Sequence, residues 1–198
     1  MEKCMQQEIT RVALDAMGGD NAPGELVKGA VDAVNGRSDI KVLLVGQQDV
    51  VEKELKQYSY PKEQIEVVHA EEVIETAEPP VNAIRKKKQS SIVVGMNMVK
   101  QKEADAFVSA GSSGAILVGG QVIVGRIRGI ERPPLAPLIP TEKGVSLLID
   151  CGANVDARAP RDGSLPARQK WNWRKSLCFW LCSSAPSSRE HSFRFANR

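Results

Sequence analysis

Two glycine-rich segments carry the residue types expected of an anion-binding site. The first, Asp15-Ala-Met-Gly-Gly-Asp20, follows a short apolar run and precedes a helical pattern that opens at Pro23. A glycine-rich turn beside a helix N-terminus leaves backbone N–H groups free to bind a phosphate or a carboxylate. The same residues also suit a tight turn capped by Asp15 and Asp20, and the spacing alone favours neither interpretation.

The second segment is Ser109-Ala-Gly-Ser-Ser-Gly114, again between an apolar run and a helical pattern. Hydroxyls framed by glycines can donate, together with backbone N–H groups, to a phosphate or an oxyanion. In the alternative, Ser112 or Ser113 only caps the following helix. Neither segment has the G-x-G-x-x-G of dinucleotide sites or the G-K-[ST] of P-loops, which disfavours nicotinamide and ATP.

A third candidate is Cys151-Gly-Ala-Asn154, where Asn154 could hydrogen-bond a substrate carbonyl. Cys151 could be a nucleophile, but a catalytic thiol needs a neighbouring base, and His69 shows no evident pairing with it. We therefore favour a packing role for Cys151. No metal site is expected.

The densest basic run is Arg85-Lys-Lys-Lys88. Such runs are most often solvated surface. Clustered positive charge also steers anionic partners, so the sharper interpretation is a docking site for an acidic protein or a phosphate-bearing arm.

Apolar runs and helical periodicity predict the elements that position these residues. The expected strands are Ile9–Leu14, Lys41–Val45, Ile65–His69, Ala106–Ser109 and Val145–Asp150. The expected helices are Pro23–Val34, Gln48–Tyr58, Ile92–Lys102, with Ser90 and Ser91 able to cap it, and Ala115–Arg128. Strands that read as continuous apolar runs indicate a parallel sheet buried on both faces, hence a three-layer α/β/α Rossmann-like sandwich. The proline-rich Glu131–Pro140 is expected to be an extended crossing, an edge or an antiparallel strand.

Charge is unevenly distributed along the 198 residues. The chain has 27 Lys+Arg and 24 Asp+Glu, but residues 161–198 hold 8 basic and 2 acidic residues, so the part before them is mildly acidic. Because the excess comes from the tail alone, no nucleic-acid partner is expected. No apolar stretch approaches the roughly 18 residues that would span a bilayer. The four cysteines form no C-x-x-C pair, which fits a reducing cytoplasm.

Five segments, in order, resemble the phosphate acyltransferase family of bacterial phospholipid synthesis (PlsX). They are Val12–Pro23, Arg85–Ser91, Ala104–Ala115, Gly125–Leu135 and Leu148–Asp156. One departure lies in the third segment, where Ser112 and Ser113 replace the usual Asn and Thr. The hydroxyl at position 113 is kept, and the amide at position 112 is lost.

The resemblance implies transfer of a fatty acyl group from acyl carrier protein to inorganic phosphate, giving acyl-phosphate for glycerol-3-phosphate acylation by a downstream acyltransferase. It implies an isocitrate/isopropylmalate dehydrogenase-like fold, here incomplete, and a homodimer without metal or organic cofactor. It also implies a cytoplasmic location, with peripheral contact at the inner face of the membrane. On this basis Gly18, Gly19, Gly111 and Gly114 shape the phosphate pocket, Ser112 and Ser113 donate to phosphate, Asp15, Asp20 and Asn154 orient substrate, and Arg85, Lys86, Lys87 and Lys88 dock the acidic carrier protein.

The resemblance stops near residue 158. We therefore expect residues 1–158 to be the N-terminal part of the phosphate acyltransferase domain. Residues 159–198, which hold all three Trp and three of the four Phe, are expected to be an aberrant, frame-shifted and disordered tail. Two alternatives stay open: an inactive truncated fragment of that enzyme, and a dehydrogenase-like or phosphotransacetylase-like domain that binds a small ligand.

Overall fold

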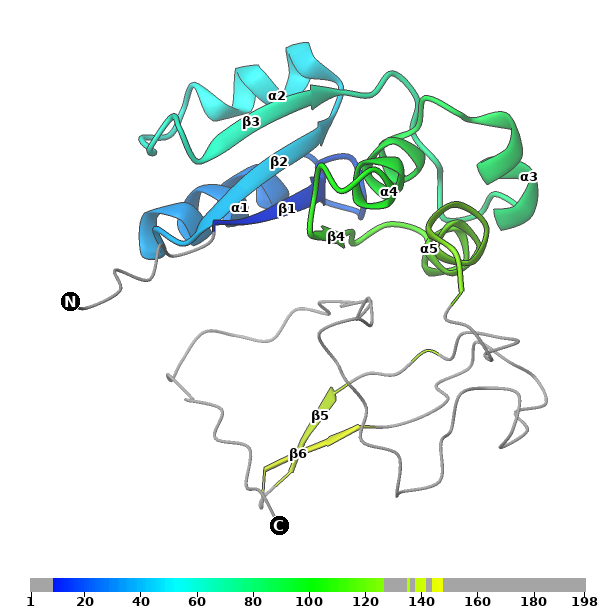
Figure 1. Cartoon of the computed structure of the whole chain (residues 1–198). Helices are drawn as coiled ribbons and strands as arrows, with labels where there is room; N and C mark the ends of the chain where they lie inside the picture. The colour runs from blue at the N-terminus through cyan, green and yellow to red at the C-terminus, as the bar shows by residue number, and fades with distance from the viewer. Residues whose placement is uncertain (1–8, 127–134, 136–137, 142–143, 148–198) are drawn as a thin grey trace.

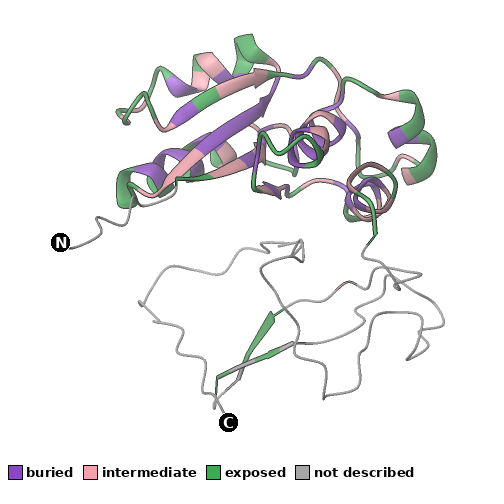
Figure 2. Ribbon diagram, in the orientation of Figure 1, coloured by how far each residue is buried: buried purple, intermediate pink, exposed green. Residues whose placement is uncertain are grey.

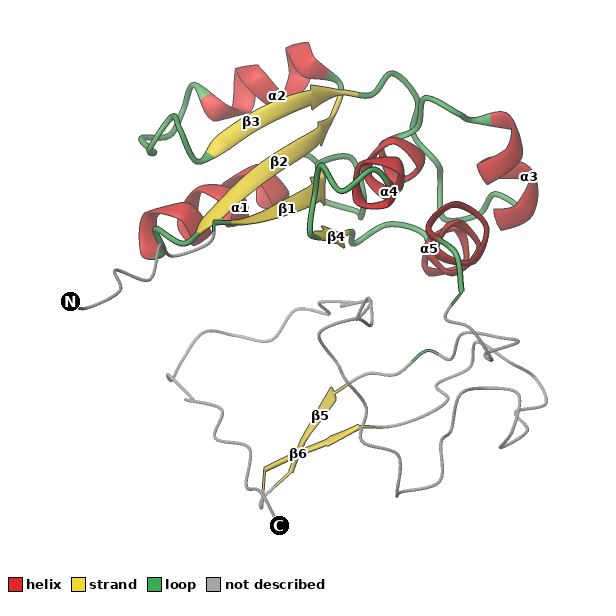
Figure 3. Ribbon diagram, viewed as in Figure 1, coloured by secondary structure: helices red, strands yellow, loops and turns green. Residues whose placement is uncertain are grey.

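A four-stranded parallel sheet forms the centre of the fold. The computed structural model describes residues 9–126, 135, 138–141 and 144–147, and the strands pair in the order β3-β2-β1-β4 (Figure 1, Figure 3). Their bounds are β1 Thr10–Asp15, β2 Ile40–Gly46, β3 Ile65–His69 and β4 Ala106–Val108. The first four strands predicted from the sequence are confirmed to within one residue at either end.

Helices separate the strands along the chain. Their bounds are α1 Gly24–Gly36, α2 Gln48–Leu55, α3 Pro80–Lys86, α4 Ser91–Lys100 and α5 Ser113–Gly119, which continues as the π-helical turn η1 Gly120–Val124. The first three predicted helices are confirmed as α1, α2 and α4. The fourth begins earlier than predicted and is α-helical only as far as Gly119. Ser90 caps α4, as expected, because its hydroxyl oxygen accepts from the N–H of Val93.

The side chains of strand β2 pack into two hydrophobic cores, one on each face of the sheet. Successive side chains of a strand point to opposite faces. Val42 and Leu44 pack with α1 and α2, whereas Leu43 and Val45 pack with α4 on the other face. Figure 2 shows the buried residues following β2 and the inner sides of these helices. The three layers of the expected α/β/α sandwich are therefore present, and double burial explains the apolar run of β2.

The last two described strands correct one prediction. Val145–Asp150 was expected to be a strand of the parallel sheet, but β6 Gly144–Leu147 pairs antiparallel with β5 Leu138–Thr141. Only residues 142 and 143 separate the two strands, and so short a connection permits a hairpin but not a parallel crossover. The expectation of an extended, antiparallel segment within Glu131–Pro140 is confirmed for the part that β5 contains.

The order of the strands reverses between β1 and β4. The chain passes from β1 to β2 to β3 and then returns, through α3 and α4, to place β4 on the far side of β1. Open α/β sheets bind ligands at the carboxyl ends of the strands beside such a reversal. In Figure 1 the arrowheads of β1, β2 and β3 point toward the side where α3, α4 and α5 gather. Both glycine-rich segments belong to that edge.

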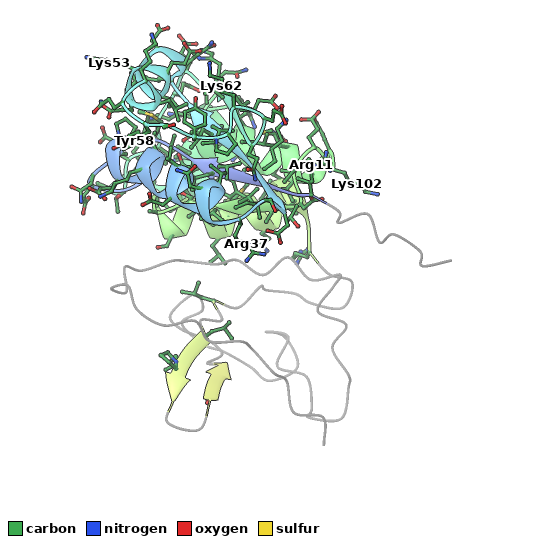
Figure 4. The ribbon with its side chains drawn as sticks, turned by 90° about the vertical axis from the view of Figure 1, so that its left-hand side faces the viewer. Arg11, Arg37, Lys53, Tyr58, Lys62 and Lys102 are labelled. Atoms are coloured by element: carbon green, nitrogen blue, oxygen red, sulfur yellow. The ribbon has the colours of Figure 1, made fainter. Side chains whose placement is uncertain are left out.

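At the amino-terminal end of β1, Arg11 holds the segment that leads into β4 through hydrogen bonds and an ion pair with Asp105. The guanidinium of Arg11 donates to the carbonyl oxygen of Lys102 over 2.8 Å, and the backbone N–H of Arg11 donates to the Asp105 carboxylate. Figure 4 shows Arg11 and Lys102 together at this end. Among the described residues, no helix is both long and apolar enough to cross a membrane.

Candidate functional site

The two glycine-rich segments meet at the carboxyl ends of neighbouring strands. Leu14 of β1 pairs with Val108 of β4 in parallel register. The next residue on each strand, Asp15 and Ser109, therefore lies at the same edge of the sheet. The residues that follow form two adjacent loops, which we call the glycine loop (residues 16–20) and the serine loop (residues 109–114).

Side-chain hydrogen bonds join these loops at their base. The hydroxyl of Ser109 donates to Oδ2 of Asp15 over 2.7 Å, and the N–H of Gly111 donates to Oγ of Ser109 over 3.0 Å. The other carboxylate oxygen of Asp15 accepts from the N–H of Met17 over 3.0 Å. Asp15 is 1% exposed and Ser109 is 4% exposed. This buried network therefore holds both loops rather than facing solvent.

Gly18 lies where only a glycine fits. A Cβ added there would stand 2.5 Å from Oδ2 of Asp15 and 2.8 Å from the backbone nitrogen of Gly111. Gly19 has φ of +95°, in the left-handed region that favours glycine. The glycine loop therefore contacts the serine loop backbone to backbone at Gly18 and Gly111.

The two serines after Gly111 differ in their surroundings. Ser112 is 4% exposed, and its oxygen caps α5 by accepting from the N–H of Ala115 over 3.3 Å. Ser113 is exposed at the first position of α5. The cap interpretation thus holds for Ser112, and Ser113 is the serine whose hydroxyl reaches the surface.

Gly114 connects the serine loop to α3. A Cβ added at Gly114 would lie 2.7 Å from Cγ of Pro80, the first residue of α3. The helix has seven residues and spans about 10 Å at 1.5 Å per residue. The basic run at the far end of α3 is therefore separated from the serine loop by about the length of this helix.

The four cations of that run are not equivalent. Arg85, Lys86 and Lys88 are exposed. The ammonium of Lys87 turns inward and donates to the carbonyl oxygen of Val73 over 2.7 Å and to Oε1 of Glu78 over 2.5 Å. Lys87 and the N–H of Glu75 hold the pKa of the Glu78 carboxyl below its ordinary value of 4.5. Three charges of the run thus face solvent, and the fourth, on Lys87, anchors the run to the preceding segment through Val73 and Glu78.

A hollow of about 450 Å³ lies away from the two loops, between β3 and α4, with Lys88 of the basic run in its lining. Its lining includes Val68 and Glu66 of β3 and Val94 and Met98 of α4, and neither loop contributes to it. The buried hydrogen bonds and the close glycine contacts mark the loops as the candidate site. Over the part of the chain that the structure describes, no three His, Cys, Asp or Glu side chains come close enough to hold a metal ion.

The comparison with known families covers this whole region. The family profile described as "Fatty acid synthesis protein" matches residues 10–161, more than half of the chain. The chain belongs to this family. Both loops and the basic run lie inside the matched residues, so the geometry above is that of a fatty acid synthesis family member.

Individual relatives of this family member carry a more specific name. Phosphate acyltransferase of Alkaliphilus oremlandii is 53% identical over 152 residues, which cover 77% of this chain and 45% of the relative. Proteins of the same name from Clostridium beijerinckii and Clostridioides difficile are 50% and 47% identical, each over 75% of this chain and 44% of the relative. The chain therefore spans less than half the length of these relatives.

For this family member, the structure brings together some of the predicted site residues. Gly18, Gly111 and Asp15 are in direct proximity, and Asp20 is exposed at the end of the glycine loop. Asn154 and Cys151 lie outside the described residues, as does the predicted tail over 159–198. Ser109 was not among the predicted site residues. The available signal was its place at the end of β4, which matches that of Asp15 at the end of β1.

Proposed function

We propose that this family member transfers a fatty acyl group from acyl carrier protein to inorganic phosphate. The observation that carries the proposal is the pair of glycine-rich loops joined at the carboxyl ends of β1 and β4, where the strand order reverses. The name shared by the relatives, phosphate acyltransferase, supports this choice among anion-binding functions.

Phosphate would be held mainly by main-chain donors. Within the described part of the chain, the N–H groups of Gly19, Ser113 and Gly114 have no hydrogen-bond acceptor, whereas Gly18 is buried and closes the turn over Ala16 and Met17. The exposed hydroxyl of Ser113 adds a side-chain donor. N–H groups directed into a loop concavity form an anion-binding nest. The N–H of Gly111 does not contribute, because it donates to Ser109.

The proposed reaction needs no nucleophilic side chain. A phosphate oxygen attacks the thioester carbonyl carbon, the C–S bond breaks, and the phosphate proton ends on the departing carrier thiolate, giving acyl-phosphate and free carrier. Holding both reactants in place can contribute roughly 7–11 kcal/mol to such a step. A well-placed N–H donor to the developing oxyanion adds about 3–4 kcal/mol. Asp15, Asp20 and Asn154 are the proposed groups that orient substrate.

The basic run would receive the carrier protein. Arg85, Lys86 and Lys88 present positive charge at the far end of α3, and α3 begins against Gly114 of the serine loop. An acidic carrier docked there would lie within reach of the phosphate site. The same proposal includes a homodimer and the supply of acyl-phosphate to a downstream glycerol-3-phosphate acyltransferase. It also includes a cytoplasmic location, with peripheral contact at the inner face of the membrane.

The test is an assay of the 198-residue chain with palmitoyl-acyl carrier protein and phosphate. Hydroxylamine traps acyl-phosphate as a hydroxamate, and phosphate binding is measured in parallel by calorimetry. We expect phosphate-dependent hydroxamate and saturable phosphate binding. A chain that binds no phosphate and forms no product contradicts the proposal. Thermal stabilisation by NAD but not by phosphate would favour the dehydrogenase-like alternative.

A further inference from the structure

A single buried contact links loops that are far apart in the chain. Asp15 and Ser109 are separated by 94 positions, yet their side chains form a 2.7 Å hydrogen bond at the base of the glycine and serine loops. Hydrogen bonds between a hydroxyl and a carboxylate are stronger than neutral ones, and burial strengthens them further. This contact is therefore strong, and because it lies at the base of both loops it can fix the position of one relative to the other.

The donors and acceptors of this contact can be arranged in only one way. A carboxylate accepts hydrogen bonds and donates none, so the Ser109 hydroxyl must donate to Asp15. The Ser109 oxygen is then free to accept, and the N–H of Gly111 donates to it. The second oxygen of Asp15 accepts from Met17 in the glycine loop. One carboxylate thus sets the backbone direction of both loops.

The loop backbones touch directly above this contact. A Cβ added to Gly111 would lie 3.4 Å from Cα of Gly18, and one added to Gly18 would meet both Asp15 and Gly111. The spacing between the unpartnered N–H groups of the two loops therefore depends on the hydrogen bond beneath them. A change of a few tenths of an ångström at Ser109 would be passed to those donors, because the backbones of Gly18 and Gly111 meet directly there.

We propose that Asp15 and Ser109 are positioning residues that set the distance between the two loops and so align their N–H donors on phosphate. Neither side chain touches the phosphate, since the oxygens of both are occupied and buried. The inference rests on the proposed function, because it assigns these residues to the phosphate site named there. It also changes the role predicted for Asp15 from contacting substrate to positioning.

A purely structural contact would behave differently. It would contribute to stability, and its loss would leave the phosphate affinity of the remaining folded protein unchanged. Ser90 provides the matched control, because it is also a fully buried serine with two hydrogen bonds, donating to the carbonyl of Lys87 and accepting from Val93. It caps α4 and belongs to neither loop.

The experiment measures phosphate affinity by calorimetry and unfolding by circular dichroism for the chain and its Ser109→Ala, Asp15→Asn and Ser90→Ala variants. Asp15→Asn keeps the side-chain volume, but in either amide orientation a donor of the network loses its acceptor. We expect Ser109→Ala and Asp15→Asn to raise the phosphate Kd about tenfold or more. Ser90→Ala should lower the melting temperature and leave the Kd within about twofold.

The outcomes separate the two proposals. Equal phosphate affinity in the chain, Ser109→Ala and Asp15→Asn overturns the positioning role and leaves the phosphate site in place. A chain that takes up no phosphate overturns the site and the positioning role together. Should both variants fail to fold, amide exchange of Gly111 in the unsubstituted chain decides: exchange that slows when phosphate is added supports coupling of the network to the site, and exchange that phosphate leaves unchanged refutes it.

Discussion

Nζ of Lys87 lies 2.5 Å from Oε1 of Glu78 and 2.7 Å from the carbonyl oxygen of Val73. This contact closes the segment between Val73 and α3, and it removes one cation from a run of four. The basic run therefore combines an anchor with three solvent-facing charges. Two substitutions that each remove one positive charge, one at the anchor and one at a solvent-facing lysine, can separate anchoring from surface charge.

Lys87→Met should destabilise the chain, whereas Lys86→Met should not. Both substitutions remove one positive charge, but only the first removes the ammonium that donates to Glu78 and to the Val73 carbonyl. We expect Lys87→Met to lower the melting temperature. Lys86→Met should change the free energy of unfolding by no more than about 0.5 kcal/mol, because Lys86 is exposed. Equal melting temperatures for the two variants would refute the anchoring role.

The Lys87 contact should also make stability depend on pH. The folded-state pKa of the Glu78 carboxyl lies below its ordinary value of 4.5. A lowered carboxyl pKa contributes stability above the unfolded value, and that contribution is lost as the pH falls through the folded value. The difference in melting temperature between the chain and Glu78→Gln should therefore be present at pH 7 and shrink as the pH falls below 4.5. A difference that grows on acidification would contradict this assignment.

Periodicity was sufficient to predict the parallel sheet and three of its helices, because buried strands and amphipathic helices leave strong patterns. It missed α3, whose seven residues begin at Pro80 after a second proline and so resemble a loop. It also misplaced the strand over Val145–Asp150. An apolar run indicates burial but not the partner, and the short link to β5 decided the pairing.

The site was predicted at the level of loops but not of individual side chains. The glycines were found because tight backbone approach limits the residues that fit, as at Gly18. The role of Ser109 was missed, because its partner Asp15 is 94 positions away and only their matching places at the ends of two predicted strands connect them. Nor does a run of four cations show which one turns inward. Long-range pairing, rather than local composition, determines both.

Gly18→Ala should disrupt the site, because the added methyl group has no room. It would lie 2.5 Å from Oδ2 of Asp15 and 2.8 Å from the backbone of Gly111, which cannot move aside as a flexible side chain would. We expect destabilisation of about 1–3 kcal/mol, typical of overpacking, in chemical denaturation. Phosphate affinity should fall in the same variant.

Gly29→Ala is the control for that substitution. Gly29 lies in α1 with nothing within 4 Å of an added Cβ. Alanine is favoured over glycine inside a helix by about 0.5–1 kcal/mol, so this variant should be more stable than the unsubstituted chain and bind phosphate equally well. The same chemical change should thus have opposite signs at the two positions. Stabilisation by Gly18→Ala would refute the close packing of the loops.

Ser112 and Ser113 should separate stability from phosphate binding. Ser112 is buried and caps α5, so Ser112→Ala should cost about 1 kcal/mol of stability, as loss of an N-cap does. Ser113 is exposed, and within the described residues its hydroxyl makes no hydrogen bond, unlike that of Ser112. Ser113→Ala should leave stability unchanged and raise the phosphate Kd about three- to tenfold. Calorimetry and denaturation on both variants measure the two effects. Unchanged phosphate affinity in Ser113→Ala would remove its hydroxyl from the site and leave binding to the backbone donors alone.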